Sequence, residues 1–190
     1  MVKLRHILYA PNQITLLRMV FVAPVIVSIL YGAYTAAFVL VLIAGLSDGV
    51  DGLLARKLGQ QTTLGTYLDP IADKLLLTSS FVALGVSGHL PLWLIILVVS
   101  RDISMMVTAL VIMLTTPLRT FPPSLYGKAN TAAQIGTVML TLLALIRPTE
   151  WLEYLAAKGV YLTAAFTVVS GLHYVLVTAS RLRAMDRGAS

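Results

Sequence analysis

Six long apolar runs, separated by short polar or proline-containing breaks, constrain the fold of this chain more than any other feature. Hydrophobic residues make up 58% of the 190 residues and charged residues only 12%, about half the charged share of an average soluble domain. About 20 mostly apolar residues cross the hydrocarbon core of a bilayer as a helix, so each run is long enough to span once. The sequence predicts an all-α integral membrane protein, a single domain over residues 1–190, with six transmembrane helices at 14–32, 35–56, 67–86, 91–116, 128–146 and 158–180.

The distribution of lysine and arginine predicts the orientation of these helices. An even number of spans places both termini on one side, and that side carries nine basic residues against two, Arg147 and Lys158, on the other. Because cytoplasmic loops are enriched in Lys and Arg, both termini are predicted to be cytoplasmic, in a cytoplasmic (inner) membrane. Residues 1–10 are predicted to lie on the membrane surface. The nine residues are Lys3, Arg5, Arg56, Lys57, Arg119, Lys128, Arg181, Arg183 and Arg187.

The formal net charge of +6 therefore indicates anionic lipid headgroups as the partner of the basic residues, and no nucleic acid is expected. Cysteine is absent, which excludes disulfides, thiolate metal sites and thiol nucleophiles.

Five of the eight acidic residues lie within the predicted spans or at their cytoplasmic ends; they are Asp48, Asp51, Asp69, Asp73 and Asp102. Asp48 and Asp51 are three residues apart, and Asp69 and Asp73 are four apart, so each pair shares one face of a helix. The pairs lie on consecutive spans, and antiparallel packing would gather four carboxylates at the cytoplasmic end. Such a shell of hard oxygens favours Mg²⁺ or Mn²⁺ over zinc, and two metal ions per site are expected, as in phosphoryl transfer.

Two non-enzymatic interpretations stay open on the residues alone. The aspartates could hold helices together by pairing with the basic residues inside the spans, Arg18, Lys74 and Arg101. A cation transporter also places carboxylates within its spans. The four acids outnumber these three basic residues, however, and they cluster at one membrane face beside Arg56 and Lys57. That location favours an anionic phosphate bound over metal ions.

The segment from residue 48 to residue 73, DGVDGLLARKLGQQTTLGTYLDPIAD, fits the pattern D-x-x-D-G-x-x-A-R-x8-G-x3-D-x3-D at every defined position. In this segment the chain resembles the CDP-alcohol phosphotransferase family. The stretches PNQITLLR at 11–18, DPIADKLLL at 69–77 and GKANTAAQ at 127–134 are similar to its phosphatidylglycerophosphate synthase and cardiolipin synthase branches. The resemblance implies transfer of the phosphatidyl group of CDP-diacylglycerol to an acceptor hydroxyl, with release of CMP, by a homodimer.

The resemblance also implies roles for individual residues. Asp73 is implied as the base that takes the proton of the attacking hydroxyl. The implied metal ligands are Asp48, Asp51, Asp69 and Asp73. The positions that receive the CDP moiety are Gly52, Ala55, Arg56 and Gly65, with Asn12, Thr15 and Arg18 adding contacts from the first span.

Basic residues of the last three spans are expected to bind an anionic, glycerol-type acceptor; they are Arg101, Lys128 and Arg181. Phosphatidylglycerophosphate synthases tend to carry two further basic residues, whereas this chain has no further arginine after Arg101 in its span and has Asn130 in place of a lysine. This difference favours phosphatidylglycerol over glycerol 3-phosphate, while the compact chain favours the reverse, so both acceptors stay open. An inositol phosphate is a third option. The alternative for Arg101 is simple pairing with Asp102, and for Arg181 an anchor at the membrane interface.

Overall fold

The computed structural model of the chain describes residues 10–58, 63–115 and 125–188, with side chains over 19–47, 74–108 and 125–180. Over these residues it is entirely helical, which confirms the predicted all-α class. Its helices are α1 (Ala10–Leu30), α2 (Tyr34–Leu58), α3 (Thr63–Val86), α4 (Leu92–Thr115), α5 (Leu125–Ile146) and α6 (Glu150–Gly188).

Each predicted span lies on a helix of its own, and the largest difference in boundaries is at α6. This helix begins at Glu150, eight residues before the predicted start at 158. Glu150 and Glu153 lie in its first turn, where the helix dipole favours negative charge, and the Glu153 N–H donates to the carbonyl of Thr149 at 3.0 Å. Residues 150–157, which precede the predicted apolar span, therefore form the first turns of α6 instead of a loop.

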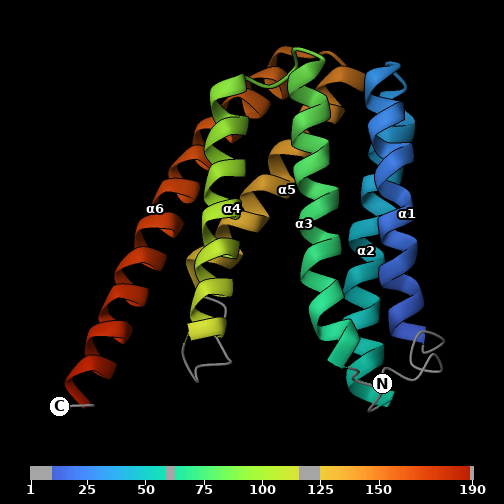
Figure 1. Ribbon diagram of the computed structural model, residues 1–190. Coiled ribbons are helices and arrows are strands. Elements are labelled where there is room, and N and C mark those ends of the chain that lie inside the picture. Colours follow the sequence, from blue (N-terminus) through green and yellow to red (C-terminus); the bar gives the residue numbers. More distant parts are fainter. Residues whose placement is uncertain (1–9, 59–62, 116–124, 189–190) are drawn as a thin grey trace.

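The six described helices form two groups (Figure 1). In the first, α1 packs against both α2 and α3; in the second, α6 packs against α4 and α5. The groups meet mainly where α5 contacts α2, and less extensively where α3 contacts α4 and α5. The α3–α4 contact is much less extensive than the α1–α3 contact.

The bundle has two distinct ends (Figure 1). At the turn end, short connections join α1 to α2, α3 to α4 and α5 to α6. Gly32 and Gly88 lie in two of these turns with φ of 75° and 78°, a backbone conformation that favours glycine. At the other end, called the termini end, α1 begins, α2 ends, α3 begins and α6 ends.

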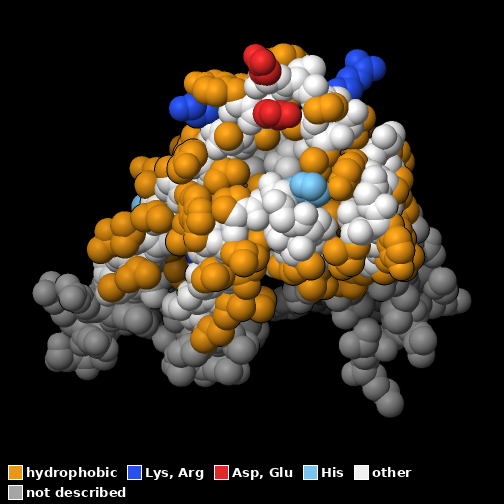
Figure 2. All heavy atoms as spheres, turned by 90° about the horizontal axis from the view of Figure 1, so that it is seen from above, with side chains coloured by type: hydrophobic (Ala, Val, Ile, Leu, Met, Phe, Trp, Pro, Cys, Tyr) orange, Lys and Arg blue, Asp and Glu red, His pale blue; other side chains and the backbone are white. Residues whose placement is uncertain are grey.

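Large apolar side chains cover much of the outer surface and also fill the interior. Phe81 and Leu94 are fully buried, whereas Ile96 and Leu176 are 68% and 69% exposed. Figure 2, which views the turn end, shows apolar side chains over much of the visible surface and few charged ones. Exposed apolar surface of this extent is unusual for a soluble monomer.

Two described segments are long and apolar enough to cross a membrane, Leu125–Ile146 and Glu150–Ser180. The apolar segments Met19–Leu30, Tyr34–Ser47 and Lys74–Val86 are shorter. Helical structure is therefore confirmed for all six predicted spans, and a membrane crossing by each of them stays a prediction.

A buried polar seam joins α5 to α6; it consists of Asn130, Gln134, Thr137, Thr163, Thr167 and Ser170. Thr137 and Thr163 share a hydrogen bond of 2.8 Å, and the Thr167 hydroxyl donates to Oδ1 of Asn130 at 2.9 Å. Hydrogen bonds between helices hold apolar bundles together.

Close packing at Gly159 gives a first prediction. A Cβ atom there would lie 2.9 Å from Oγ1 of Thr137, which the hydrogen bond to Thr163 holds in place. Gly159→Ala should therefore lower the unfolding free energy by about 1–3 kcal/mol, as overpacking does. At Gly136 a Cβ would meet nothing within 4 Å, so Gly136→Ala should raise it by about 0.5–1 kcal/mol. Thermal unfolding in detergent measures both, and equal shifts would contradict the α5–α6 packing.

Candidate functional site

The four aspartates of the motif lie on two helices that meet the same end of the bundle. Asp48 and Asp51 belong to the last three turns of α2, and Asp69 and Asp73 to the first three turns of α3. Both segments are helical, which confirms the helical spacing behind the predicted pairs. Figure 1 places the end of α2 and the beginning of α3 together at the termini end. The side chains of residues 48–73 lie outside the described ones, so the carboxylate cluster itself stays a prediction.

The other nucleotide-binding candidates share this end. Gly52, Ala55 and Arg56 follow the first aspartate pair on α2, and Gly65 lies in the first turn of α3. The first turns of α1, which packs against both helices, carry Asn12, Thr15 and Arg18. Their side chains are also outside the described ones.

The donor chemistry of the four aspartates fits a divalent metal site. Carboxylates from two helices supply the hard oxygens that Mg²⁺ and Mn²⁺ prefer. Among the described side chains, no group of three or more His, Asp or Glu residues is placed to hold a metal ion.

Charged side chains meet at the junction of α3, α4 and α6. We call Lys74, Arg101, Asp102 and Ser170 the junction network. The Lys74 ammonium donates to both carboxylate oxygens of Asp102, at 2.9 Å each. Arg101 donates to Oδ1 of Asp102 at 2.7 Å through Nη1 and to the Ser170 hydroxyl through Nη2. The network thus links three helices in one chain of hydrogen bonds.

Burial makes this network electrostatically significant. The side chains of Arg101 and Asp102 are 8% and 12% exposed, and that of Lys74 is 38% exposed. Two cations share one carboxylate, so these three side chains carry a formal charge of +1. The Arg101 Nε is buried without a partner.

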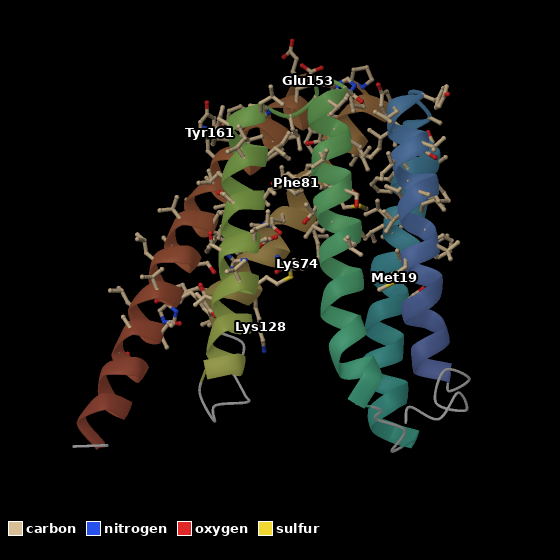
Figure 3. The ribbon with its side chains drawn as sticks, viewed as in Figure 1. Met19, Lys74, Phe81, Lys128, Glu153 and Tyr161 are labelled. Carbon is tan, nitrogen blue, oxygen red and sulfur yellow. The ribbon has the colours of Figure 1, made fainter. Side chains whose placement is uncertain are left out.

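The three predicted acceptor-binding residues are placed differently. Arg101 is paired with Asp102, which is the simpler of the two roles considered from the sequence. Lys128 lies exposed near the start of α5, closer to the termini end than Lys74 (Figure 3). Arg181 belongs to α6, and its side chain is not among the described ones.

The sequence did not predict the polar seam, nor the hydrogen bond of Ser170 to Arg101 in the junction network. A signal was present, because Thr163, Thr167 and Ser170 recur at helical spacing within an apolar run. Gln134 is fully buried, and both of its amide atoms lack a hydrogen-bond partner.

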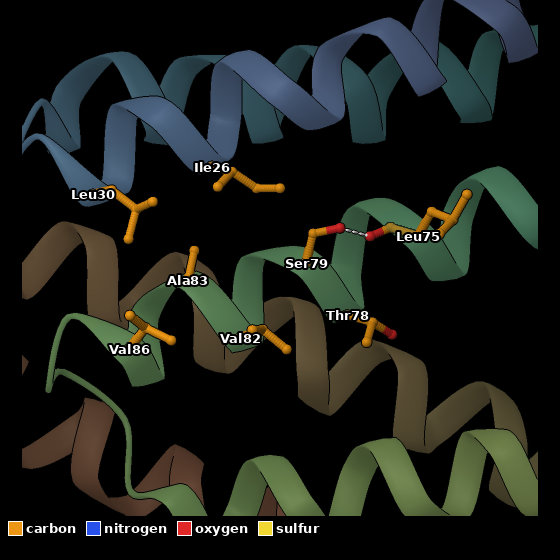
Figure 4. Close-up of a pocket in the computed structure, with 8 residues that line it drawn as sticks. All are labelled: Ile26, Leu30, Leu75, Thr78, Ser79, Val82, Ala83 and Val86. Atoms are coloured by element: carbon orange, nitrogen blue, oxygen red, sulfur yellow. Dashed lines mark hydrogen bonds between the residues drawn. The ribbon is translucent and has the colours of Figure 1, made fainter.

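Two surface pockets are lined by residues outside the motif. One, of about 290 Å³, is an apolar groove between α1 and α3 lined by Ile26, Leu75 and Val82, among others (Figure 4). Its lining suits a hydrocarbon chain better than a phosphate. The other, of about 560 Å³, is lined by Trp93, Glu153 and neighbouring residues near the turn end.

The chain matches the CDP-alcohol phosphatidyltransferase family over residues 8–170. It is 34% identical over 172 residues to a probable phosphatidylglycerophosphate synthase of Mycobacterium tuberculosis, covering 86% of this chain and 78% of that protein. It is 36% identical over 143 residues to the CDP-diacylglycerol--glycerol-3-phosphate 3-phosphatidyltransferase of Bacillus subtilis, covering 75% of this chain and 72% of that protein.

A probable cardiolipin synthase (CMP-forming) of Drosophila melanogaster is 34% identical over 188 residues, covering 90% of this chain. The chain spans 58% of the length of that fly protein. The chain therefore belongs to the CDP-alcohol phosphatidyltransferase family, which confirms the resemblance carried by residues 48–73. The family and the names of these relatives indicate a phosphatidyltransferase, and they leave its acceptor open.

Proposed function

We propose that the protein transfers the phosphatidyl group of CDP-diacylglycerol to a hydroxyl of a glycerol-type acceptor and releases CMP. The observation that carries this proposal is the complete family motif on two helices, α2 and α3, that end and begin at the same end of the bundle. A cation transporter does not require that motif, and metal-dependent release of CMP distinguishes the two functions.

We further propose that all six helices span a cytoplasmic membrane, with the termini end at the cytoplasmic face. The exposed apolar surface supports the membrane location. The excess of Lys and Arg on the termini and on the loops of the termini end supports the orientation. The active site then lies at the cytoplasmic face. A homodimer is part of the same proposal, and the mass of the purified protein in detergent tests it.

The aspartates of α2 and α3 have distinct proposed roles. Asp48, Asp51, Asp69 and Asp73 would hold two Mg²⁺ or Mn²⁺ ions, which when bound neutralise the charge of the pyrophosphate. Asp73 also accepts the proton of the acceptor hydroxyl. The hydroxyl oxygen forms a bond to the phosphorus that carries diacylglycerol, while the bond from that phosphorus to the CMP oxygen breaks.

Residues beside the aspartates bind the donor. Arg56 contacts phosphate oxygens through its planar guanidinium. Gly52 and Ala55 leave space for the cytidine, and Gly65 keeps the approach open. Asn12 and Thr15 contribute polar contacts from α1. Catalysis then rests mainly on positioning and charge neutralisation.

The acceptor is proposed to be either glycerol 3-phosphate, giving phosphatidylglycerophosphate, or phosphatidylglycerol, giving cardiolipin. Lys128 and Arg181 are proposed to contact its phosphate, with Arg101 supplying positive charge from within the bundle. The relatives carry names of both kinds, which supports the glycerol class without separating its members. An inositol phosphate is the alternative acceptor.

Purified protein tests this proposal when it receives CDP-diacylglycerol and Mg²⁺ or Mn²⁺ with one acceptor at a time. The parallel reactions contain glycerol 3-phosphate, phosphatidylglycerol, inositol phosphate or no acceptor. We expect CMP and a new phospholipid in equal amounts with one glycerol-type acceptor only, measured by chromatography and mass spectrometry. If only inositol phosphate is used, the acceptor is an inositol phosphate and not of the glycerol type. CMP release without any acceptor would indicate hydrolysis.

A further inference from the structure

The junction network begins one residue after Asp73, the proposed base. Lys74 follows Asp73 directly on α3, and its ammonium reaches across to Asp102 on α4. Through Arg101 the same contact continues to Ser170 on α6. A polar connection therefore runs from the helix that carries Asp69 and Asp73 to the second group of helices.

A short connection joins α3 to α4 at the turn end, and beyond it little packing holds the two helices together. Their packing contact is small compared with the contacts of α1 with α3 and of α5 with α6. Lys74, which is 38% exposed, donates to both carboxylate oxygens of Asp102, which is 12% exposed, so this pair can contribute to the placement of α3 beside α4. Loss of Asp102 would remove the ion-pair partner that the structure gives the buried Arg101, which is costly.

The geometry gives Asp102 a role other than metal binding or proton transfer. Both of its carboxylate oxygens accept hydrogen bonds from Lys74, and Oδ1 also accepts one from Arg101. Without Asp102, the Lys74 ammonium and the Arg101 guanidinium would lose the carboxylate that they share. Repulsion would then move the start of α3 away from α4.

We propose that Asp102 is a positioning residue for the transfer reaction, acting through Lys74 to hold α3 in register with α4 and α6. This proposal rests on the proposed phosphatidyl transfer. Displacement of a catalytic group by about 1 Å can lower a rate about a hundredfold. The predicted signature is therefore a lower kcat with donor binding largely retained.

The test compares Asp102→Asn, Lys74→Met and the double variant with the wild type, in the full-length protein. We expect kcat for CMP release to fall about 10-fold to 100-fold in each single variant, with KM for CDP-diacylglycerol changed less than about threefold. Because the two residues act as a unit, the double variant should be no slower than the slower single variant. Lys74→Arg, which keeps the charge, should recover most of the rate.

Thermal unfolding of the same four proteins provides a readout independent of activity. If Lys74 and Asp102 are paired, the Tm loss in the double variant should be smaller than the sum of the two single losses. Ser100→Ala is the matched control on α4, because this exposed serine donates only to the carbonyl of Leu97 in its own helix. Its kcat and Tm should equal those of the wild type.

The outcomes separate the two proposals. If the wild type releases no CMP, the proposed function has failed and the positioning role falls with it. If the wild type is active and the variants keep its kcat, or if their Tm losses are additive, the positioning role alone is overturned. If Asp102→Asn does not fold, Lys74→Met and Lys74→Arg decide: equal kcat values in these two variants would overturn the role.

Discussion

Asp73→Asn is expected to lower the rate of CMP release about 10²-fold to 10⁴-fold, the usual contribution of a positioned general base. Asparagine has nearly the same shape as aspartate, but it cannot accept the hydroxyl proton as a carboxylate does. It also removes one negative charge from the proposed metal ligands. The measurement is the steady-state rate of CMP release with saturating CDP-diacylglycerol and acceptor.

Glu153→Gln is the matched control for this prediction. It removes the same charge from an exposed acid in the first turn of α6, at the turn end of the bundle. Its rate should equal that of the wild type. A rate for Asp73→Asn within about threefold of the control would remove Asp73 from the reaction, because far larger losses accompany removal of a base.

Removal of divalent metal is expected to have an effect of similar size. Metal ions supply several kcal/mol of charge stabilisation in phosphoryl transfer, which corresponds to about a thousandfold in rate. Treatment with a chelator should therefore abolish CMP release, and added Mg²⁺ or Mn²⁺ should restore it. Asp51→Asn should require more metal for half-maximal activity, because it replaces a negatively charged carboxylate ligand with a neutral amide.

The metal dependence is measured by titrating CMP release with Mg²⁺ and with Mn²⁺, for the wild type and for Asp51→Asn. Ser100→Ala should have the same titration midpoint as the wild type. Full activity in excess chelator would contradict the assignment of Asp48, Asp51, Asp69 and Asp73 as metal ligands. An unchanged midpoint for Asp51→Asn would remove that residue from the set.

The helical fold was predictable because apolar runs of spanning length leave the backbone little alternative to helices in a lipid environment. Gly32 and Gly88, both with positive φ, lie in two of the breaks between the apolar runs. The start of α6 was not predicted, since hydropathy ignores the favourable placement of Glu150 and Glu153 in a first helical turn.

The site was predictable to the extent that its chemistry is local in sequence. Residues 48–73 form one continuous segment that contains the whole family motif. The spacing of the aspartates within it also predicts which of them share a helix face. The junction network was not predictable in the same way. Lys74 and Asp102 are 28 residues apart and Arg101 and Ser170 are 69 apart, and helical periodicity does not determine which of several buried charges meet.

The destination of the transferred phosphorus tests phosphatidyl transfer most directly. CDP-diacylglycerol labelled with ³²P at the phosphorus attached to diacylglycerol is incubated with the wild type, Mg²⁺ and a glycerol-type acceptor. Phosphatidyl transfer predicts that the label moves entirely into the lipid product and that the released CMP is unlabelled. Label in the released nucleotide, or the absence of any labelled lipid other than the donor, would contradict the proposed function.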